Sequence, residues 1–431
     1  MIQGARQVGK TTTVNAFAGS YDTYVSLNLE RPEDLRLVEN DLPFRDVLQR
    51  IFLEKGVQRR GETLLFIDEI QNSPRAVELM RYFFEDEPGM HVIAAGSLLE
   101  IMMEKQRVSF PVGRVEYRYM FPSSFSEFLA ACSEQEALSL LRQVPVPSWA
   151  LPRLFDLFHR YAQIGGMPEA VERYSRSRDV TELSPVYQGL ITAFQDDVGR
   201  YSHSAHAAAV IRHLLEMAPF EAGKRVVFER FGGTSYRSRD AGEALRTLER
   251  AMLVYLRTPT TRWSLPLVPD ERKRPRLQFL DTGLLNHCVG LTARFYDHHD
   301  LHAFHQGILA EHIVAQELMA ADSLSVRKPL FWIRENRQGN AEVDFLIPYA
   351  GTVVPVECKA GKSGTLRSLH VYAEHSHCQV AVRLYSGRPQ VGSVATPSGE
   401  RYTLISLPYF LASMLGRYLD LYFTGDLHFD E

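Results

Sequence analysis

The sequence has few cysteines and no long hydrophobic run. Its four cysteines are widely spread, without the short paired spacing of a zinc site or a disulfide framework: Cys132, Cys288, Cys358 and Cys378. No stretch approaches the roughly 18 consecutive apolar residues of a membrane-spanning helix, and the N-terminus lacks the charged and apolar segments of an export signal. These absences argue against a disulfide-stabilised secreted domain and an integral membrane protein. They predict a soluble protein of the reducing cytoplasm.

Neither sign of charge dominates the sequence. The net charge is −4, and 23% charged residues stand against 45% hydrophobic residues, which is the balance of an ordinary globular protein. The molecule is therefore not a polyelectrolyte, and any surface for nucleic acid must be local. A chain of 431 residues exceeds one ordinary hydrophobic core, so two to four domains are expected.

The first 122 residues show the pattern of an α/β domain. Three short runs are apolar on both faces, as expected for parallel strands covered by helices on both sides. They are TYVSLNL (23–29), TLLFIDEI (63–70) and HVIAAGS (91–97). Residues 74–87 carry apolar side chains at helical spacing and begin with a proline, which suits a first helical turn. We predict a parallel sheet with helices over residues 1–122.

The remaining sequence divides into three further units and a tail. In residues 123–203 apolar residues recur every three or four positions, which predicts a helical lid subdomain. Residues 204–275 give two helices and an extended segment, which indicates a winged helix-turn-helix. Residues 276–395 are a mixed α/β unit with two strands that turn at Gly351, and residues 396–431 are assigned to a C-terminal tail.

A phosphate-binding motif lies at the very start of the chain. The stretch GARQVGKTT matches the pattern G-x-x-x-x-G-K-[ST] at every fixed position, with Gly4, Gly9, Lys10 and Thr11. Glycines permit a loop whose backbone N–H groups converge on phosphate oxygens, the lysine approaches the β- and γ-phosphates, and the threonine hydroxyl reaches magnesium. The motif predicts a site for ATP and Mg²⁺ at these residues and the adjoining Thr12.

Further site residues follow predicted strands. Asp68 is expected to hold Mg²⁺, and Glu69 to orient or deprotonate the attacking water. Ser97 would contact the γ-phosphate or the water, or else form a turn or helix cap. Arg114 would neutralise transition-state charge as an arginine finger, in its own subunit or a neighbouring one, or else be an ordinary surface arginine. A finger acting on a neighbour would require a homo-oligomer.

Together these motifs resemble those of prokaryotic AAA-type ATPases. Members of that family share the GARQVGKTT loop, LLFIDEIQ, AAGSLLE, a GR pair and FPSSFSEFL, and the likeness continues through GGMPEAV (165–171). The resemblance implies a P-loop ATPase of the additional-strand class.

The sequence departs from this family in front of the loop. Only Met1, Ile2 and Gln3 precede Gly4, where the family carries a strand and usually a helix that contacts the base. Loss of a central strand of about five apolar residues would forfeit on the order of 10 kcal/mol. We therefore expect the native start to lie upstream, and nucleotide binding to be weak if it does not.

Positive charge is concentrated in the middle of the chain. Residues 224–276 contain 13 Lys and Arg against six Asp and Glu. Neutralising phosphates with such residues gives sequence-independent affinity for nucleic acid. Four arginines lie on or beside the candidate recognition helix: Arg237, Arg239, Arg246 and Arg250. We predict DNA contact here, with a protein-binding helix or a merely solvated surface as alternatives.

Carboxylates near the C-terminus indicate a metal site. Glu342 and Asp344 share one face of a predicted strand, and Glu357 and Lys359 share one face of the next, so the turn between the strands would bring the two sets together. In metal-dependent phosphodiester cleavage, carboxylates hold magnesium and a lysine positions or activates the attacking water. Glu311, on a predicted helix, is a further candidate ligand.

This spacing resembles the PD-(D/E)xK restriction-endonuclease-like fold, found in the domain of unknown function that habitually follows this ATPase core. By resemblance, Asp344 and Glu357 take the metal and Lys359 acts in catalysis. A nuclease fold can also serve for binding alone. The histidine-rich run DHHDLHAFH (297–305) is expected to be a solvated loop and not a zinc site.

Two functions are consistent with these residues. The leading one is an ATP-hydrolysing P-loop protein with a helical lid, a winged helix and an endonuclease-like domain that acts on or near DNA. The alternative is a regulatory switch that senses nucleotide and binds a protein partner without cleavage. The Asp, Glu and Lys set and the local positive charge favour the first, while the absence of a base-reading motif leaves room for the second.

Overall fold

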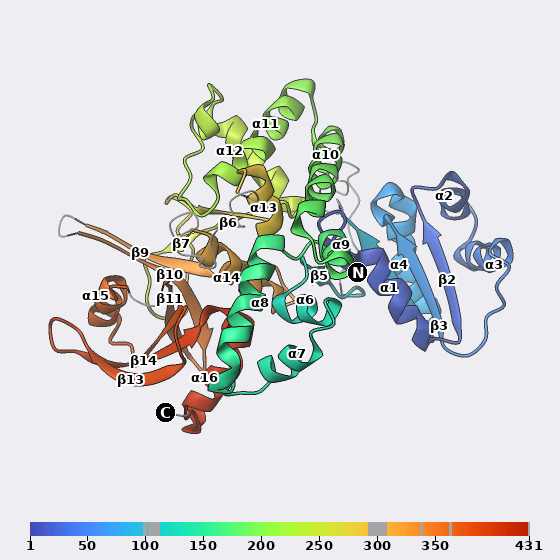
Figure 1. Ribbon diagram of the computed structural model, residues 1–431. Helices are drawn as coiled ribbons and strands as arrows, with labels where there is room; N and C mark the ends of the chain where they lie inside the picture. The colour runs from blue at the N-terminus through green and yellow to red at the C-terminus, as the bar shows by residue number, and fades with distance from the viewer. Residues whose placement is uncertain (98–100, 102–112, 292–307, 337–338, 362–363, 430–431) are drawn as a thin grey trace.

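The computed structural model describes residues 1–97, 101, 113–291, 308–336, 339–361 and 364–429. Figure 1 shows an N-terminal α/β part in blue, helices in green at the centre, and a C-terminal sheet in orange and red on the far side of those helices. The histidine-rich run 297–305 lies outside the described residues. Among the described helices, none combines the length and apolar character needed to span a membrane.

The N-terminal part is built on a five-stranded sheet in the order β2-β3-β4-β1-β5, with all neighbours parallel. Its elements are β1 (Ile2–Gly4), α1 (Lys10–Phe17), β2 (Thr23–Asn28), α2 (Pro32–Val38), α3 (Phe44–Glu54), β3 (Thr63–Asp68), α4 (Pro74–Asp86), β4 (Met90–Gly96) and β5 (Arg118–Met120). The expected α/β fold is thereby confirmed. Because β4 lies between β1 and β3, the sheet has the inserted strand that the additional-strand class requires.

The strand in front of the phosphate loop is short but central. Ile2 pairs with Ala95 of β4 on one side and with Arg118 of β5 on the other. The Met1 ammonium donates to the Glu116 carbonyl at 2.8 Å. Strand β1 thus places the loop at the carboxyl edge of the sheet.

Alternation along β3 explains how helices cover both faces of this sheet. Leu64 and Phe66 pack with Val14 of α1, whereas Leu65 and Ile67 pack with α2, α3 and α4 on the other face. All six residues of β3 are buried, as the doubly apolar sequence predicts. Helix α4 begins at its proline, and the preceding serine caps it by accepting a backbone hydrogen bond.

Five helices form the middle of the molecule. They are α6 (Phe125–Ala131), α7 (Gln135–Leu141), α8 (Leu151–Ile164), α9 (Pro168–Ser177) and α10 (Ser184–Tyr201). Ser124 and Glu127 form a capping box at the start of α6. Buried aromatic side chains of α6 and α8, such as Phe125 and Phe158, share one core with Phe410 near the C-terminus. The helical part is therefore packed against the C-terminal part.

The region expected to be a winged helix contains two helices and a hairpin. Helices α11 (Ala205–Glu221) and α12 (Ser238–Arg250) precede the antiparallel strands β6 (Val254–Arg257) and β8 (Arg276–Phe279). The connection between these strands contains β7 (Pro259–Thr260), which pairs in parallel with β9 of the C-terminal sheet. The wing is therefore tied to another sheet over part of its length.

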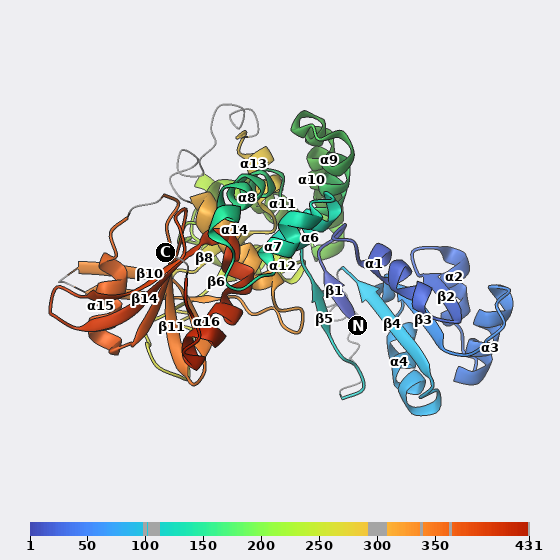
Figure 2. The same ribbon diagram turned by 60° about the horizontal axis from the view of Figure 1, so that its bottom comes forward.

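A seven-stranded sheet forms the C-terminal part, in the order β13-β14-β12-β11-β10-β9-β7. Its further elements are α13 (Thr282–Cys288), α14 (Ile308–Ala320), β9 (Leu330–Asn336), β10 (Gly339–Tyr349), β11 (Thr352–Cys358), α15 (Arg367–Ser376), β12 (Val380–Tyr385), β13 (Gln390–Ala395), β14 (Arg401–Pro408) and α16 (Leu415–Thr424). Strands β10 and β11 form the expected hairpin around Gly351, whose φ of 77° suits glycine. Helices α14 and α15 pack on opposite faces (Figure 2).

The predicted separation of a tail over residues 396–431 is corrected by this sheet. Strand β14 lies between β12 and β13 and hydrogen-bonds to both. The turn that follows it, residues 409–414, buries Tyr409 and Phe410 completely. The domain therefore extends beyond residue 395, because its central strands need β14 as a neighbour.

The segments around Gly166 and Asp281 form a buried joint between the helical and C-terminal parts. The Gly166 N–H donates to Asp281 at 2.6 Å, and the Gly166 carbonyl accepts from the Ser123 N–H at 2.7 Å. Glu317 of α14 accepts from the Phe125 N–H and the Tyr161 hydroxyl. Burial raises the pKa of Asp281 to about 6 and that of Glu317 to about 7. The joint is thus a buried network of hydrogen-bonded polar groups.

Candidate nucleotide site and C-terminal acidic cluster

The phosphate loop joins β1 to α1 through backbone conformations that turn the chain sharply. Gln7 and Gly9 have φ values of 64° and 94°, and α1 begins immediately afterwards at Lys10. A Cβ at Gly4 would lie 2.6 Å from the Met120 carbonyl oxygen, so only glycine lets β5 approach the loop this closely. A loop of this shape that leads into a helix start is typical of phosphate-binding sites.

Lys10 folds back onto this loop. Its side chain is 6% exposed, and Nζ donates to the carbonyl oxygens of Gly4 at 3.0 Å and Ala5 at 2.9 Å. Burial lowers the pKa of the ammonium to about 8, and the nearby carboxylates of Glu69 and Asp68 oppose this effect. The ammonium is therefore held beside the loop by carbonyl groups that phosphate oxygens would outcompete.

Asp68 and Thr11 meet at the end of β3. The Thr11 hydroxyl donates to Asp68 Oδ2 at 2.6 Å, and Asp68 Oδ1 accepts from the Glu69 N–H at 3.0 Å. A hydroxyl and a carboxylate in contact form the pair of hard oxygen ligands that Mg²⁺ prefers when it is shared with a nucleotide. The residues present therefore fit Mg²⁺ together with ATP.

Glu69 occupies a strained and buried position beside this pair. Its φ of 53° places a non-glycine residue in the left-handed region, at a cost of about 1–3 kcal/mol. Its carboxylate accepts a hydrogen bond from Gln71 Nε2. Burial raises its pKa, and the Gln71 bond and Lys10 oppose that rise. A raised pKa makes the carboxylate a stronger base than an exposed glutamate.

A cavity of about 790 Å³ opens over the loop, which lies within the usual size range of small-molecule sites. The loop and Glu69 line one side of it, and Pro168 and Glu169 at the start of α9 line another. Ser323, which follows α14, lines it too, and its carbonyl accepts from the Tyr119 N–H at 2.8 Å. Three parts of the chain therefore border the cavity.

Ser97 and Arg114 lie in different places relative to the loop. Ser97 directly follows β4, the strand between β1 and β3, and is nearly buried at the carboxyl edge of the sheet. Arg114 donates from Nε to Glu85 Oε1 at 2.8 Å. Glu85 is in the last turn of α4, which leads into the beginning of β4, so this ion pair lies at the sheet edge away from the loop. The structure does not bring Arg114 to Lys10 within one chain.

One long-range contact of the loop has no signal in the sequence pattern. Arg6, a variable position of the motif, donates from Nη1 to both carboxylate oxygens of Asp197 in α10, at 2.5 and 2.7 Å. Asp197 is buried, and it is separated from Arg6 by 191 positions. Arg200, also of α10, pairs with Glu30 after β2 at 3.3 Å. These ion pairs connect the loop domain to the helical part.

Residues 1–129 match the family model described as an AAA domain. This part of the chain is an AAA-type P-loop domain. The match runs from Met1 into α6 and includes the whole phosphate loop and the acidic pair at the end of β3. Residues 155–294 and 306–410 match models that are each described as a domain of unknown function, DUF8612 and DUF4143.

Two solved structures from Aeropyrum pernix are similar to parts of the chain. The ORC1 protein in complex with DNA is 17% identical, with coverage of 68% of this chain and 87% of that one and a TM-score of 0.26. The ORC2 protein in ADPNP–ADP complexes is 12% identical, with coverage of 69% and 88% and a TM-score of 0.27. Both scores are below 0.5, so the fold rests on the sheet topology given above. No curated protein matches the sequence.

Outside the AAA domain, the predicted nuclease-like residues gather around two arginines. Glu311 accepts from Arg257 Nη1 at 3.0 Å and also pairs with Arg276, whose Nη1 lies 3.3 Å from Asp344 Oδ1. Glu342 pairs with Arg276 as well. In the part of the chain that the structure describes, no group of three or more His, Cys, Asp or Glu side chains could hold a metal ion.

Glu357 and Lys359 form their own pair beside this cluster. Lys359 Nζ lies 2.5 Å from Glu357 Oε1. Burial and the charge of Asp344 raise the pKa of Glu357 to about 8, while the Lys359 ammonium acts in the opposite direction. The two predicted faces of the hairpin thus converge, as the spacing suggests, but their carboxylates meet cations of the chain.

The four arginines predicted for DNA contact differ in their exposure and in their contacts. Arg237 and Arg239 are exposed at the start of α12, where Arg239 pairs with Glu243 at 3.0 Å, and Arg250 is half-buried. Arg246 instead lines a cavity of about 380 Å³ together with the basic run of the wing. We call this cavity the basic hollow, after its cationic residues Arg246, Arg272, Lys273, Arg274 and Lys328. Glu249 and Glu271 line it as well, and Glu249 pairs with Lys328. Among the described residues, no ion pair is formed by Arg246 or Arg274.

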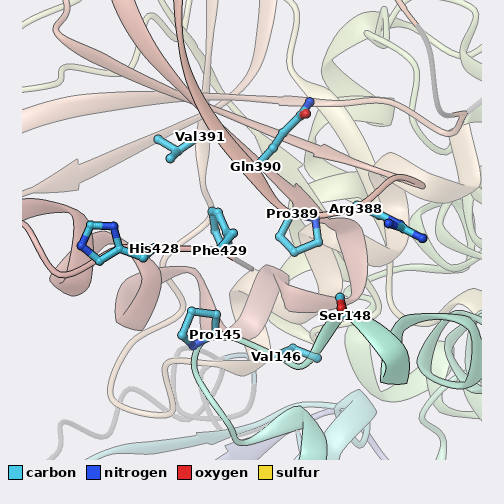
Figure 3. A pocket seen from close by; sticks show the side chains of 9 residues that line it. All are labelled: Pro145, Val146, Ser148, Arg388, Pro389, Gln390, Val391, His428 and Phe429. Atoms are coloured by element: carbon cyan, nitrogen blue, oxygen red, sulfur yellow. The ribbon is translucent and has the colours of Figure 1, made fainter. Parts of the chain in front are cut away.

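Another cavity, of about 400 Å³, lies between the loop before α8, the start of β13 and the C-terminal segment. Figure 3 shows the nine side chains that line it, among them Val146, Gln390 and Phe429. Arg388 is the only Lys, Arg, Asp or Glu of this lining, within the residues described. The cavity contains none of the predicted site residues and no array of titratable groups suited to catalysis.

Proposed function

We propose that the protein binds Mg-ATP in the AAA domain and hydrolyses it. The observation that carries this proposal is the contact between the Thr11 hydroxyl and Asp68 beside the buried ammonium of Lys10. Thr11 and Asp68 would hold Mg²⁺, and the amides from Gly9 to Thr12 would face the phosphates. Bound Mg²⁺ would supply neutralisation of the phosphate charge.

Side chains of the protein carry out the other parts of the proposed reaction. Lys10 exchanges its two carbonyl partners for phosphate oxygens, a gain because charge-assisted hydrogen bonds are the stronger ones. Glu69 orients a water and accepts its proton, with Gln71 fixing the carboxylate. Ser97 contacts the γ-phosphate or that water from the end of β4. Arg114 acts as a finger on a neighbouring copy, which calls for a homo-oligomer.

Nucleotide occupancy is proposed to reach the rest of the molecule through the borders of the cavity. The loop contacts α10 through Arg6 and Asp197, and Pro168 and Ser323 bring α9 and the end of α14 to the same cavity. The buried joint at Gly166 then continues from the helical part into the C-terminal sheet. This arrangement suits a switch whose ATPase state alters the distal domains.

Duplex DNA is the partner proposed for the basic hollow. Exposed guanidinium groups of Arg246 and Arg274 are available to phosphates, and the wing contributes Arg272, whose side chain is 90% exposed. The contact is expected to be independent of base sequence, because it depends on backbone charge. A protein partner with an acidic surface is the alternative, and competition by salt-matched duplex DNA separates the two.

The ATPase proposal is tested by phosphate release from Mg-ATP. Thr11→Ala is expected to lower turnover at least about 100-fold, since it removes a metal ligand. Thr13→Ala is the matched control, because the contact seen for Thr13 is its backbone N–H to the Gly9 carbonyl and its side chain is exposed. Equal turnover by the wild type and Thr11→Ala would contradict the proposal.

A further inference from the structure

The two arginines in the acidic cluster come from one hairpin. Arg257 of β6 and Arg276 of β8 are directly opposite each other in the antiparallel register, so their side chains leave the same face of the ribbon. This face meets α14 and β10, which carry Glu311, Glu342 and Asp344. Two guanidinium groups are thereby delivered side by side to three carboxylates.

Arg257 is enclosed on every side. Its side chain is 1% exposed, and Nε donates to the Pro329 carbonyl at 3.2 Å, while Nη2 donates to the Asp344 carbonyl. Its guanidinium lies 4.3 Å from the centroid of the Phe345 ring. An arginine buried in this way must keep its charge paired, because the free energy of leaving it alone is high.

Arg276 bridges the carboxylates that a metal would need. It contacts Glu311, Glu342 and Asp344 together, and its guanidinium lies 5.0 Å from the Phe331 ring centroid. Asp344 Oδ2 is already occupied by the Cys358 N–H at 2.9 Å. Each of these three carboxylates therefore has at least one oxygen engaged by a group of the chain.

The pairing of carboxylates with cations in the cluster also argues against a bound divalent metal. Four carboxylates, those of Glu311, Glu342, Asp344 and Glu357, face the cations of Arg257, Arg276 and Lys359. Two buried oxygens of the cluster, Glu342 Oε1 and Glu357 Oε2, have no hydrogen-bond partner among the described residues, and Glu342 Oε1 lies against Arg276. Mg²⁺ or Mn²⁺, which take about six ligands, would have to displace the Arg276 guanidinium that Glu311, Glu342 and Asp344 share.

We infer that the acidic cluster of the C-terminal sheet is a receptor for the two guanidinium groups of the β6–β8 hairpin, and that it is not a divalent metal centre. The residues that the nuclease-like resemblance assigns to metal binding do not fit a metal here. The cluster instead fixes the hairpin, and with it α11 and α12, to the C-terminal sheet. The pairing of β7 with β9 strengthens the same attachment.

This inference is independent of ATP hydrolysis, and it is tested on the full chain without nucleotide. Mn²⁺ binding is measured by electron paramagnetic resonance for the wild type and for Asp344→Asn. The two proteins are expected to bind the same amount of Mn²⁺, and neither is expected to cleave plasmid DNA. One Mn²⁺ more in the wild type, or metal-dependent cleavage that Asp344→Asn removes, would overturn the inference.

The role of the guanidinium groups is tested by thermal unfolding. Arg276→Gln is expected to lower the melting temperature by about 5 °C or more, because it leaves three half-buried carboxylates without their shared cation. Arg272→Gln is the matched control in the same connection, since its side chain is 90% exposed, and it is expected to melt as the wild type does. Equal melting temperatures for Arg276→Gln and the control would refute the receptor role. If Arg276→Gln does not fold, the Mn²⁺ comparison still decides.

Discussion

Replacing Glu69 by glutamine is expected to stop hydrolysis while leaving ATP binding almost unchanged. Glutamine has the same shape, and its carbonyl oxygen can still accept the hydrogen bond from Gln71 Nε2. It cannot take a proton from water. Positioned general bases contribute roughly 10²–10⁴-fold to rate, which is about 3–5 kcal/mol of the barrier. Turnover of Glu69→Gln is therefore expected to fall by about 100-fold or more.

The surroundings of Glu69 explain why binding should survive the substitution. Glutamine at position 69 would adopt the same left-handed backbone conformation as glutamate, at φ 53° and at the same energetic cost. The end of β3 therefore keeps its shape. The carboxylate of Glu69 helps to keep Lys10 protonated, and its removal lowers the pKa of Lys10 further. Binding is therefore compared at pH 7, about one unit below the Lys10 pKa of about 8.

The assay combines single-turnover phosphate release with calorimetric titration of Mg-ATP. Glu169→Gln is the matched control, because Glu169 lines the same cavity from α9 without contacting the loop motif in the described contacts. The control should keep turnover within about threefold of the wild type. Turnover of Glu69→Gln within threefold of the wild type would refute its role as the base. A loss of turnover in Glu169→Gln alone would instead assign the role of general base to Glu169 of α9.

Three further outcomes are expected. ATP affinity should be constant below pH 8 and fall up to about tenfold per pH unit above it, as the Lys10 ammonium loses its proton, in titrations from pH 7 to 9.5. Because the pKa of Glu317 is raised to about 7 in the folded protein, the contribution of this group to the free energy of unfolding is fully present below pH 4.5, its ordinary pKa. That contribution, roughly 3 kcal/mol, is lost as the pH rises to 7. Denaturant titrations of Glu317→Gln should show a smaller loss of stability over this pH range, and equal losses would contradict this. Arg246→Glu combined with Arg274→Glu should weaken duplex DNA binding at least about tenfold and reduce the salt slope by about two, whereas Arg153→Glu should do neither; unchanged affinity would exclude the basic hollow.

Sequence patterns predicted those helices, strands and turns that depend mainly on neighbouring residues in the chain. The doubly apolar run at β3, the proline at the start of α4 and the turn at Gly351 each specify an element through neighbouring residues. The phosphate loop belongs to this class, since the glycines and the following helix are contiguous. The roles of its side chains stay predictions until they are measured.

Contacts between distant segments could not be predicted in this way. Arg6 and Asp197 are ordinary charged residues in their own segments, and no periodicity relates positions 191 apart. In the sequence, Arg257 and Arg276 belong to a region rich in positive charge. In the folded protein both side chains instead form buried ion pairs with carboxylates. Strand β14 was assigned to the tail because its burial depends on neighbours supplied by β12 and β13. In each case the deciding partner lies far along the chain.

Calorimetric titration of Mg-ATP into the full chain, beside Lys10→Ala, tests the central claim most directly. The account predicts saturable binding by the wild type near neutral pH and its loss in Lys10→Ala, because the loop then lacks the only ammonium that the described residues place against its carbonyls. Thr13→Ala should bind as the wild type does. Absence of binding by the folded wild type, or equal binding by Lys10→Ala, would contradict the account.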